Sequence, residues 1–79
     1  MGFLPKKQLI AIHAKTNLPE KKIVKLDEIW LRLDVPQRSL VLDRLDFKKD
    51  GIQKEARIPL DRLNPVLIKK LAKFYEERL

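Results

Sequence analysis

The sequence contains no cysteine, one histidine and two glycines. Without cysteine the chain cannot form disulfides, thiolate metal sites or cysteine nucleophiles, and this fits an intracellular protein. His13 has no second histidine to complete a zinc site or a nucleophile relay. Gly2 and Gly51 are too far apart to form a glycine-rich phosphate loop. We therefore expect a non-enzymatic protein without a metal or other cofactor.

Long hydrophobic runs are also missing. Residues 1–14 contain two lysines and no apolar stretch long enough for a signal peptide or a membrane span. We therefore expect a soluble protein of the cytoplasm or nucleoid, with no membrane partner. With 79 residues the chain forms a single domain. Its first 22 residues fit either a short helix or a strand, followed by a loop.

Basic side chains outnumber acidic ones, with 18 lysines and arginines against 11 aspartates and glutamates. The resulting net charge of +7 attracts polyanions, including nucleic acid and acidic protein surfaces. A comparable excess of charge also serves solubility alone. The charge therefore permits nucleic-acid binding without requiring it.

The dipeptide Asp50-Gly51 is typical of a type I′ hairpin turn, which needs two central residues with positive φ. In this register Val41 lies opposite Leu60, and Leu45 lies opposite Ala56. One face of both strands then becomes mostly apolar and the other polar, as a half-buried sheet requires. The pattern predicts an antiparallel hairpin centred on Asp50-Gly51.

Two further segments complete the predicted fold. Residues 29–35 alternate between apolar and polar side chains, which indicates a strand joined to the hairpin by a short connection. Asn64 and Pro65 are typical of a helix start, and the apolar residues that follow recur at helical spacing, with Lys69, Lys70 and Lys73 facing water. The sequence therefore predicts an α+β fold, in which an antiparallel β-meander of three to four strands packs against a C-terminal helix.

A second fold is compatible with the same residues. Leu26, Ile29, Trp30 and Leu33 also occur at the i, i+3, i+4, i+7 spacing of a helix. Helices over residues 26–33 and 40–47, around a turn at 34–39, would form a winged helix-turn-helix. Such a protein would regulate transcription by placing a helix in the major groove of double-stranded DNA.

The outward face of the predicted meander carries the candidate nucleic-acid site. Arginine and lysine neutralise phosphates, and an exposed aromatic ring stacks on bases with about 1–3 kcal/mol each. If the tryptophan packs inside the domain, this stacking surface is lost. We expect binding of single-stranded DNA or RNA through the basic sheet face. The face and the ends of its hairpin comprise Trp30, Arg32, Arg38, Arg44, Lys48, Lys49 and Arg57.

Several short stretches resemble a known family. They are residues 29–35, LVLDRLDF at 40–47, KKDG at 48–51, RIPL at 57–60 and the helix start at 64–65. Over residues 23–79 the chain resembles the positive-cofactor-four family of transcriptional coactivators, dimers that bind single-stranded DNA. The resemblance implies that Phe47 is the stacking aromatic and that Arg44 and Lys54 are basic contacts. The chain departs from the family at residues 55–57, and the hairpin register turns Phe47 toward the helix instead.

A function of a different class also fits. The helix residues Leu67, Leu71 and Phe74 form an apolar stripe that would dock on a larger polymerase or ribonucleoprotein complex, or would form a homodimer. The same stripe would otherwise only cover the protein's own sheet. Nucleic-acid binding and docking as an accessory subunit therefore both stand as hypotheses.

Overall fold

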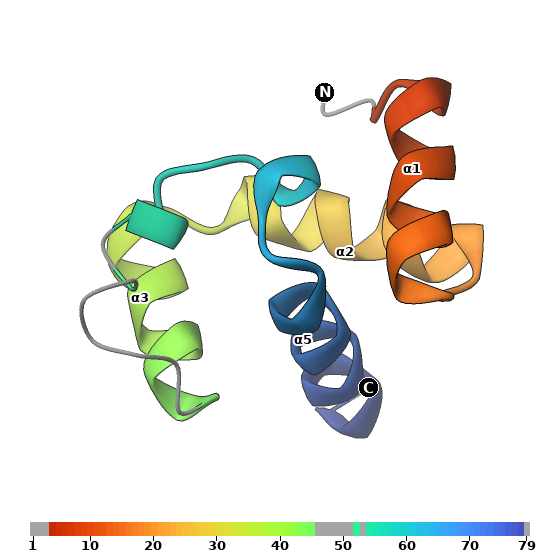
Figure 1. The fold of residues 1–79 in the computed structure, drawn as a ribbon. Helices are drawn as coiled ribbons and strands as arrows, with labels where there is room; N and C mark the ends of the chain where they lie inside the picture. The colour runs from red at the N-terminus through yellow and green to blue at the C-terminus, as the bar shows by residue number, and fades with distance from the viewer. Residues whose placement is uncertain (1–3, 46–51, 53, 79) are drawn as a thin grey trace.

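The computed structural model describes residues 4–45, 52 and 54–78, and it describes the side chains as far as residue 76. The described residues contain helices, turns and bends but no β-strand. The predicted α+β fold with an antiparallel meander is therefore wrong. The elements are α1 (Lys6–Thr16), α2 (Glu20–Arg32), α3 (Val35–Arg44), the short 3₁₀ helix η1 (Leu60–Arg62) and α5 (Pro65–Arg78), as Figure 1 shows.

The N-terminal segment forms the helix α1, which resolves the choice between helix and strand. The carbonyl of Pro5 accepts the first hydrogen bonds, from the amides of Gln8 and Leu9 at 3.0 Å each. At the other end Asn17 takes a left-handed conformation with φ 62°, and its amide donates to the His13 carbonyl at 2.7 Å. Asparagine tolerates this conformation better than most residues, so it ends the helix and starts the connection to α2.

Residues 29–35 comprise the end of α2, a two-residue connection and the first residue of α3, and they do not form the predicted strand. The helical spacing was the correct interpretation, because Leu26 and Trp30 are buried on one side of α2. Leu33 and Asp34 then join α2 to α3. The two helices of the winged-helix alternative therefore exist in outline, but α3 starts at Val35, within the predicted turn, and the described residues show no β-wing.

A capping box explains why α3 starts so early. The Asp34 carboxylate accepts from the Gln37 amide at 2.9 Å, and the Gln37 side-chain oxygen accepts from the Asp34 amide at 3.0 Å. Both donors belong to the helix N-terminus and would otherwise lack an intrahelical partner. The proline that follows at 36 is tolerated because it lies in the first turn.

The two predicted hairpin strands also have other conformations. Val41 and Leu45 lie at the end of α3, and Lys54 and Glu55 have helical backbone. The Ala56 amide donates to the Ile52 carbonyl at 2.9 Å, as in a helical turn. Asp50-Gly51 lies outside the described residues, so the structure does not describe the predicted turn itself.

The C-terminal helix is present as predicted. The Asn64 side-chain oxygen accepts from the Val66 amide at 2.9 Å, and α5 begins at Pro65. Leu67, Ile68 and Leu71 of α5 are buried. They cover other helices rather than a sheet.

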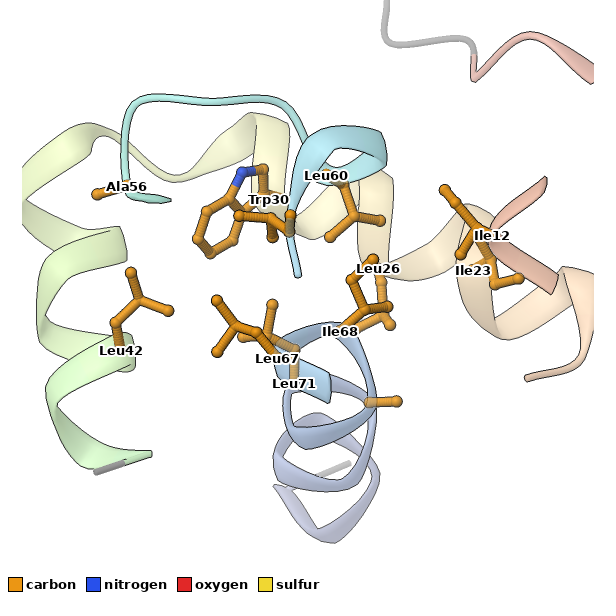
Figure 2. Packing of buried hydrophobic residues seen from close by; sticks show 12 residues of the cluster. Ile12, Ile23, Leu26, Trp30, Leu42, Ala56, Leu60, Leu67, Ile68 and Leu71 are labelled. Atoms are coloured by element: carbon orange, nitrogen blue, oxygen red, sulfur yellow. The ribbon is translucent and has the colours of Figure 1, made fainter. Parts of the chain in front are cut away.

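One hydrophobic core joins the elements. Helices α1, α2 and α5 contact one another, and η1 contacts α1 and α2. Figure 2 shows Leu42 of α3 pointing toward Leu67 and Leu71 of α5, and all three belong to the same buried cluster as Trp30. The buried apolar residues are Ile12, Ile23, Leu26, Trp30, Leu42, Ala56, Leu60, Leu63, Leu67, Ile68, Leu71 and Ala72.

Candidate nucleic-acid interface

Trp30, the predicted stacking residue, lies in the core. Its side chain is 1% exposed, and Figure 2 shows it among the buried side chains. The indole Nε1 donates to the carbonyl of Ile58 at 2.9 Å, so the polar group of the ring is satisfied internally. In this structure Trp30 has no face on which a base can stack.

Arg38, another predicted contact, is bound to Trp30. Its guanidinium carbon lies 4.9 Å from the centroid of the indole ring, a cation–π distance. Its Nε donates to the Trp30 carbonyl at 2.9 Å, and one terminal nitrogen donates to the Ala56 carbonyl at 3.1 Å. Arg38 therefore joins α2, α3 and the segment before η1 by a charged donor to one carbonyl at the end of α2 and to one in the turn at Ala56.

Four other predicted contacts are exposed. Arg32 ends α2, Arg44 ends α3, and Lys54 and Arg57 precede η1. Within the part of the chain that the structure describes, none of them has an ion-pair partner. The sheet that would have gathered them is absent from that part, and Phe47, Lys48 and Lys49 lie outside it.

The predicted partner stripe on the last helix is mostly covered. Leu67 and Leu71 are buried, and Phe74 is half-buried with its ring edge-to-face against Tyr75 at a centroid distance of 5.1 Å. The two leucines pack within the protein's own core, which was the alternative role of the stripe. A partner would have to bind another surface unless the core opens.

The solvent side of α5 carries a basic group that the sequence interpretation did not treat as a site. Lys69, Lys70 and Lys73 are exposed and lie within about one turn of the helix. We call these three residues the α5 lysine face. About one turn later on α5, Glu76 forms an ion pair with Lys22 of α2 at 2.9 Å. The sequence feature that could have identified this site is the spacing of the three lysines opposite the apolar stripe. It was used only to predict that they face water, and their grouping was not considered.

Other cations lie on the first two helices. Exposed lysines occur along α1 and α2, whereas Glu20 and Glu28 are the exposed acidic residues of these helices. The lysines of α1 are spread over the helix, because Lys6 and Lys15 point about 180° apart around its axis and Lys15 lies more than two turns after Lys7. The α5 lysine face is therefore a denser group of positive charge than the one on α1.

The described carboxylates include one that is buried and none that belong to a metal-binding group. Asp27 of α2 is 6% exposed, and burial, followed by the nearby charges of Asp61 and Glu28, raises its pKa. Among the described residues no three histidine or acidic side chains are placed to hold a metal ion. His13 is exposed, and its Nδ1–H donates to the Leu18 carbonyl, which ties α1 to the loop that follows it.

In the described part of the chain, no helix is long and apolar enough to cross a membrane. The sheet implied by the resemblance to the positive-cofactor-four family is likewise not among these residues. Comparison of the chain with protein-family models, with curated proteins and with solved structures gave no match, which neither supports nor refutes that resemblance.

Proposed function

We propose that this protein is a non-enzymatic nucleic-acid-binding module that contacts the phosphate backbone through the α5 lysine face. The single observation that carries the proposal is the grouping of Lys69, Lys70 and Lys73 on one exposed turn, with no ion pair to any of them among the described residues. Each unpaired lysine that meets a phosphate releases a bound counterion, which favours association at low salt.

The proposed contact is to phosphates rather than to bases. Trp30 is buried and Arg38 is bound to carbonyl groups, so the two residues best suited to base recognition are occupied. Lysine is a compact, mobile cation that suits phosphate neutralisation without fixed geometry. We therefore expect binding with little sequence preference. Because Trp30 is buried, base stacking on it is no longer a reason to expect single strands to bind better than duplexes.

Fluorescence anisotropy with labelled single- and double-stranded oligonucleotides tests this function. The triple variant Lys69→Gln/Lys70→Gln/Lys73→Gln lowers the net charge from +7 to +4. We expect its slope of log affinity against log salt on duplex DNA to decrease by about 2 to 3, since each lost phosphate contact removes about 0.9.

A matched control separates the α5 lysine face from net charge alone. The variant Lys6→Gln/Lys7→Gln/Lys15→Gln also has a charge of +4, but it removes exposed lysines of α1. We expect it to keep most of the wild-type slope. Equal effects of the two variants would refute the assignment to α5, and no binding of the wild type to either oligonucleotide at low salt would refute the function.

A further inference from the structure

An open groove lies between α2 and α5. Its volume is about 200 Å³, below the roughly 300–1,000 Å³ typical of small-molecule pockets. Side chains of both helices line it, and four of them give it an apolar base: Leu26, Ile29, Ala72 and Tyr75. Because two packed helices form the base, the groove has the shape to receive one or two apolar side chains.

The rim of the groove is charged. Lys22 Nζ lies 2.9 Å from Glu76 Oε2, so this pair links α2 to α5 and cancels its own charge. Lys25 also lines the groove, and no carboxylate among the described residues pairs with it. Neither Lys21 nor Glu28, which are exposed about one turn before and after Lys25 on α2, lines the groove. The rim on the α2 side is therefore positive, and its complement is an acidic group beside an apolar one.

We propose that this groove binds a short amphipathic segment of a partner protein, with an apolar side chain on the base and a carboxylate paired with Lys25. Tyr75 and Ile29 are half-buried and line the groove, so an apolar group that covers them is removed from water together with them. Tyrosine is frequent among the residues that dominate binding energy at protein interfaces. The apolar base suits a peptide side chain better than a hydrated phosphate.

The groove and the α5 lysine face are neighbours around α5, and Lys69 is the lysine nearest the groove, about 60° from Ala72 around the helix axis. Lys70 is two residues from Ala72, and Lys73 is two residues from Tyr75. Two residues correspond to about 160° around a helix, so each of these lysines points away from a side chain that lines the groove. Substitutions at Lys70 and Lys73 therefore change the α5 lysine face and leave the groove lining unchanged.

The test is an NMR titration of the full ¹⁵N-labelled chain with a designed peptide. The probe is an acetylated peptide of about a dozen residues, with leucines at helical i, i+3, i+4 spacing and glutamates and alanines elsewhere. We expect its amide shift changes to centre on Lys25, Ile29, Ala72 and Tyr75. A second peptide with glutamine for glutamate, and a third with serine for leucine, should each bind at least threefold more weakly.

Charge reversal at Lys25 tests its proposed pairing with a peptide carboxylate and leaves the core unchanged. Lys25 is exposed, so Lys25→Glu is expected to fold normally. It should weaken the glutamate peptide about threefold to tenfold, and it should improve binding of a lysine version of the peptide.

The result against the proposal would be shift changes spread over all exposed lysines, or centred on the α5 lysine face. An unchanged affinity of Lys25→Glu for the glutamate peptide would also overturn it. The Lys70→Gln/Lys73→Gln variant, which keeps Lys69 beside the groove, should retain peptide binding, so failure of this inference and failure of the nucleic-acid proposal give different outcomes.

Discussion

At the scale of single residues, Arg38 and Trp30 show how a side chain suited to a ligand can be used internally. An indole N–H buried in a small core needs an acceptor, and the Ile58 carbonyl provides one. The guanidinium of Arg38 then lies over the ring and donates to two carbonyls. A pair that chemistry would assign to nucleic-acid recognition therefore stabilises the junction of α2, α3 and the segment before η1.

Replacing Arg38 should lower stability rather than nucleic-acid affinity. We expect Arg38→Ala to reduce the free energy of unfolding by about 2 kcal/mol, because it leaves two carbonyls without a charged donor and removes the cation–π contact. Arg38→Lys should retain less than half of this stabilisation, since lysine lacks the planar guanidinium group that donates to two carbonyls. Urea unfolding measures the change. Arg44→Ala, an exposed control on the same helix, should stay within about 0.5 kcal/mol of the wild type.

Asp27 should make stability depend on pH. Because burial raises the pKa of Asp27 in the folded state above its ordinary value of 3.8, the folded protein binds more protons than the unfolded chain between those two pKa values. Stability therefore falls as pH rises from about 3.8 through the raised pKa, and the cost of the buried charge is complete above it. We expect Asp27→Asn to raise Tm at neutral pH.

The increase in Tm from Asp27→Asn should shrink as pH falls. It should vanish below about 3.8, where Asp27 is protonated in both the folded and the unfolded wild type. Thermal unfolding followed by circular dichroism across this range measures it. Asp43→Asn removes an equal charge from an exposed position of α3 and is the matched control. A gain for Asp27→Asn that is the same at every pH would rule out the charge of Asp27 as its cause.

At the scale of elements, the prediction failed where the spacing of apolar residues fits both the period of a strand and the period of a helix. Val41 and Leu45 are four residues apart, and this spacing places them on one face of a strand and also on one face of a helix. The predicted hairpin register used such pairs, so its internal consistency did not distinguish a strand from the end of α3. Asn64 and Pro65, in contrast, identified a helix start through a specific hydrogen bond, and this prediction is confirmed.

The start of α3 should depend on its capping box. Asp34→Ala removes the acceptor for the Gln37 amide, and we expect it to cost about 1 kcal/mol of unfolding free energy. Gln37→Glu should be neutral or slightly stabilising, because glutamate is an alternative partner in the same box. Hydrogen exchange at the first amides of α3 provides the measurement. Unchanged protection in Asp34→Ala would show that packing alone defines the start of α3.

The candidate site was predictable only in part. Composition and spacing correctly assigned Lys69, Lys70 and Lys73 to the solvent side of the last helix. The helical spacing of residues 26–33 is consistent with the burial of Trp30, but its partners Ile58 and Arg38 lie 28 and 8 residues further along the chain, and no local pattern identifies them. The groove between α2 and α5 depends on how two distant helices pack, and no local pattern contains that information.

At the scale of the whole molecule, positive charge is opposed by few internal ion pairs. The described residues contain one, Lys22–Glu76, and its side chains are 46% and 63% exposed. Such a pair contributes about 0–1 kcal/mol. The principal extents are 30 × 24 × 22 Å, comparable to the Debye length of about 30 Å at 0.01 M salt. Positive charges on opposite sides of the molecule therefore repel one another when salt is low.

Moderate salt should stabilise the fold. Raising NaCl from about 0.01 M to about 0.15 M shortens the Debye length to about 8 Å, which screens repulsion among the cations. We expect Tm to rise by several degrees, since about 1 kcal/mol corresponds to roughly 4–8 °C in a domain of this size. The Lys69→Gln/Lys70→Gln/Lys73→Gln variant should respond less. A fall of Tm with salt would indicate a fold that depends on ion pairs instead.

The sequence has one tryptophan and one tyrosine, and the structure places them at different positions. Trp30 lies where α2, α3 and the segment before η1 meet, whereas Tyr75 lines the groove between α2 and α5. The protein therefore carries two intrinsic optical reporters without any labelling. Indole emission will follow the loss of the core junction during unfolding, while the phenol absorbance will respond to occupancy of the groove.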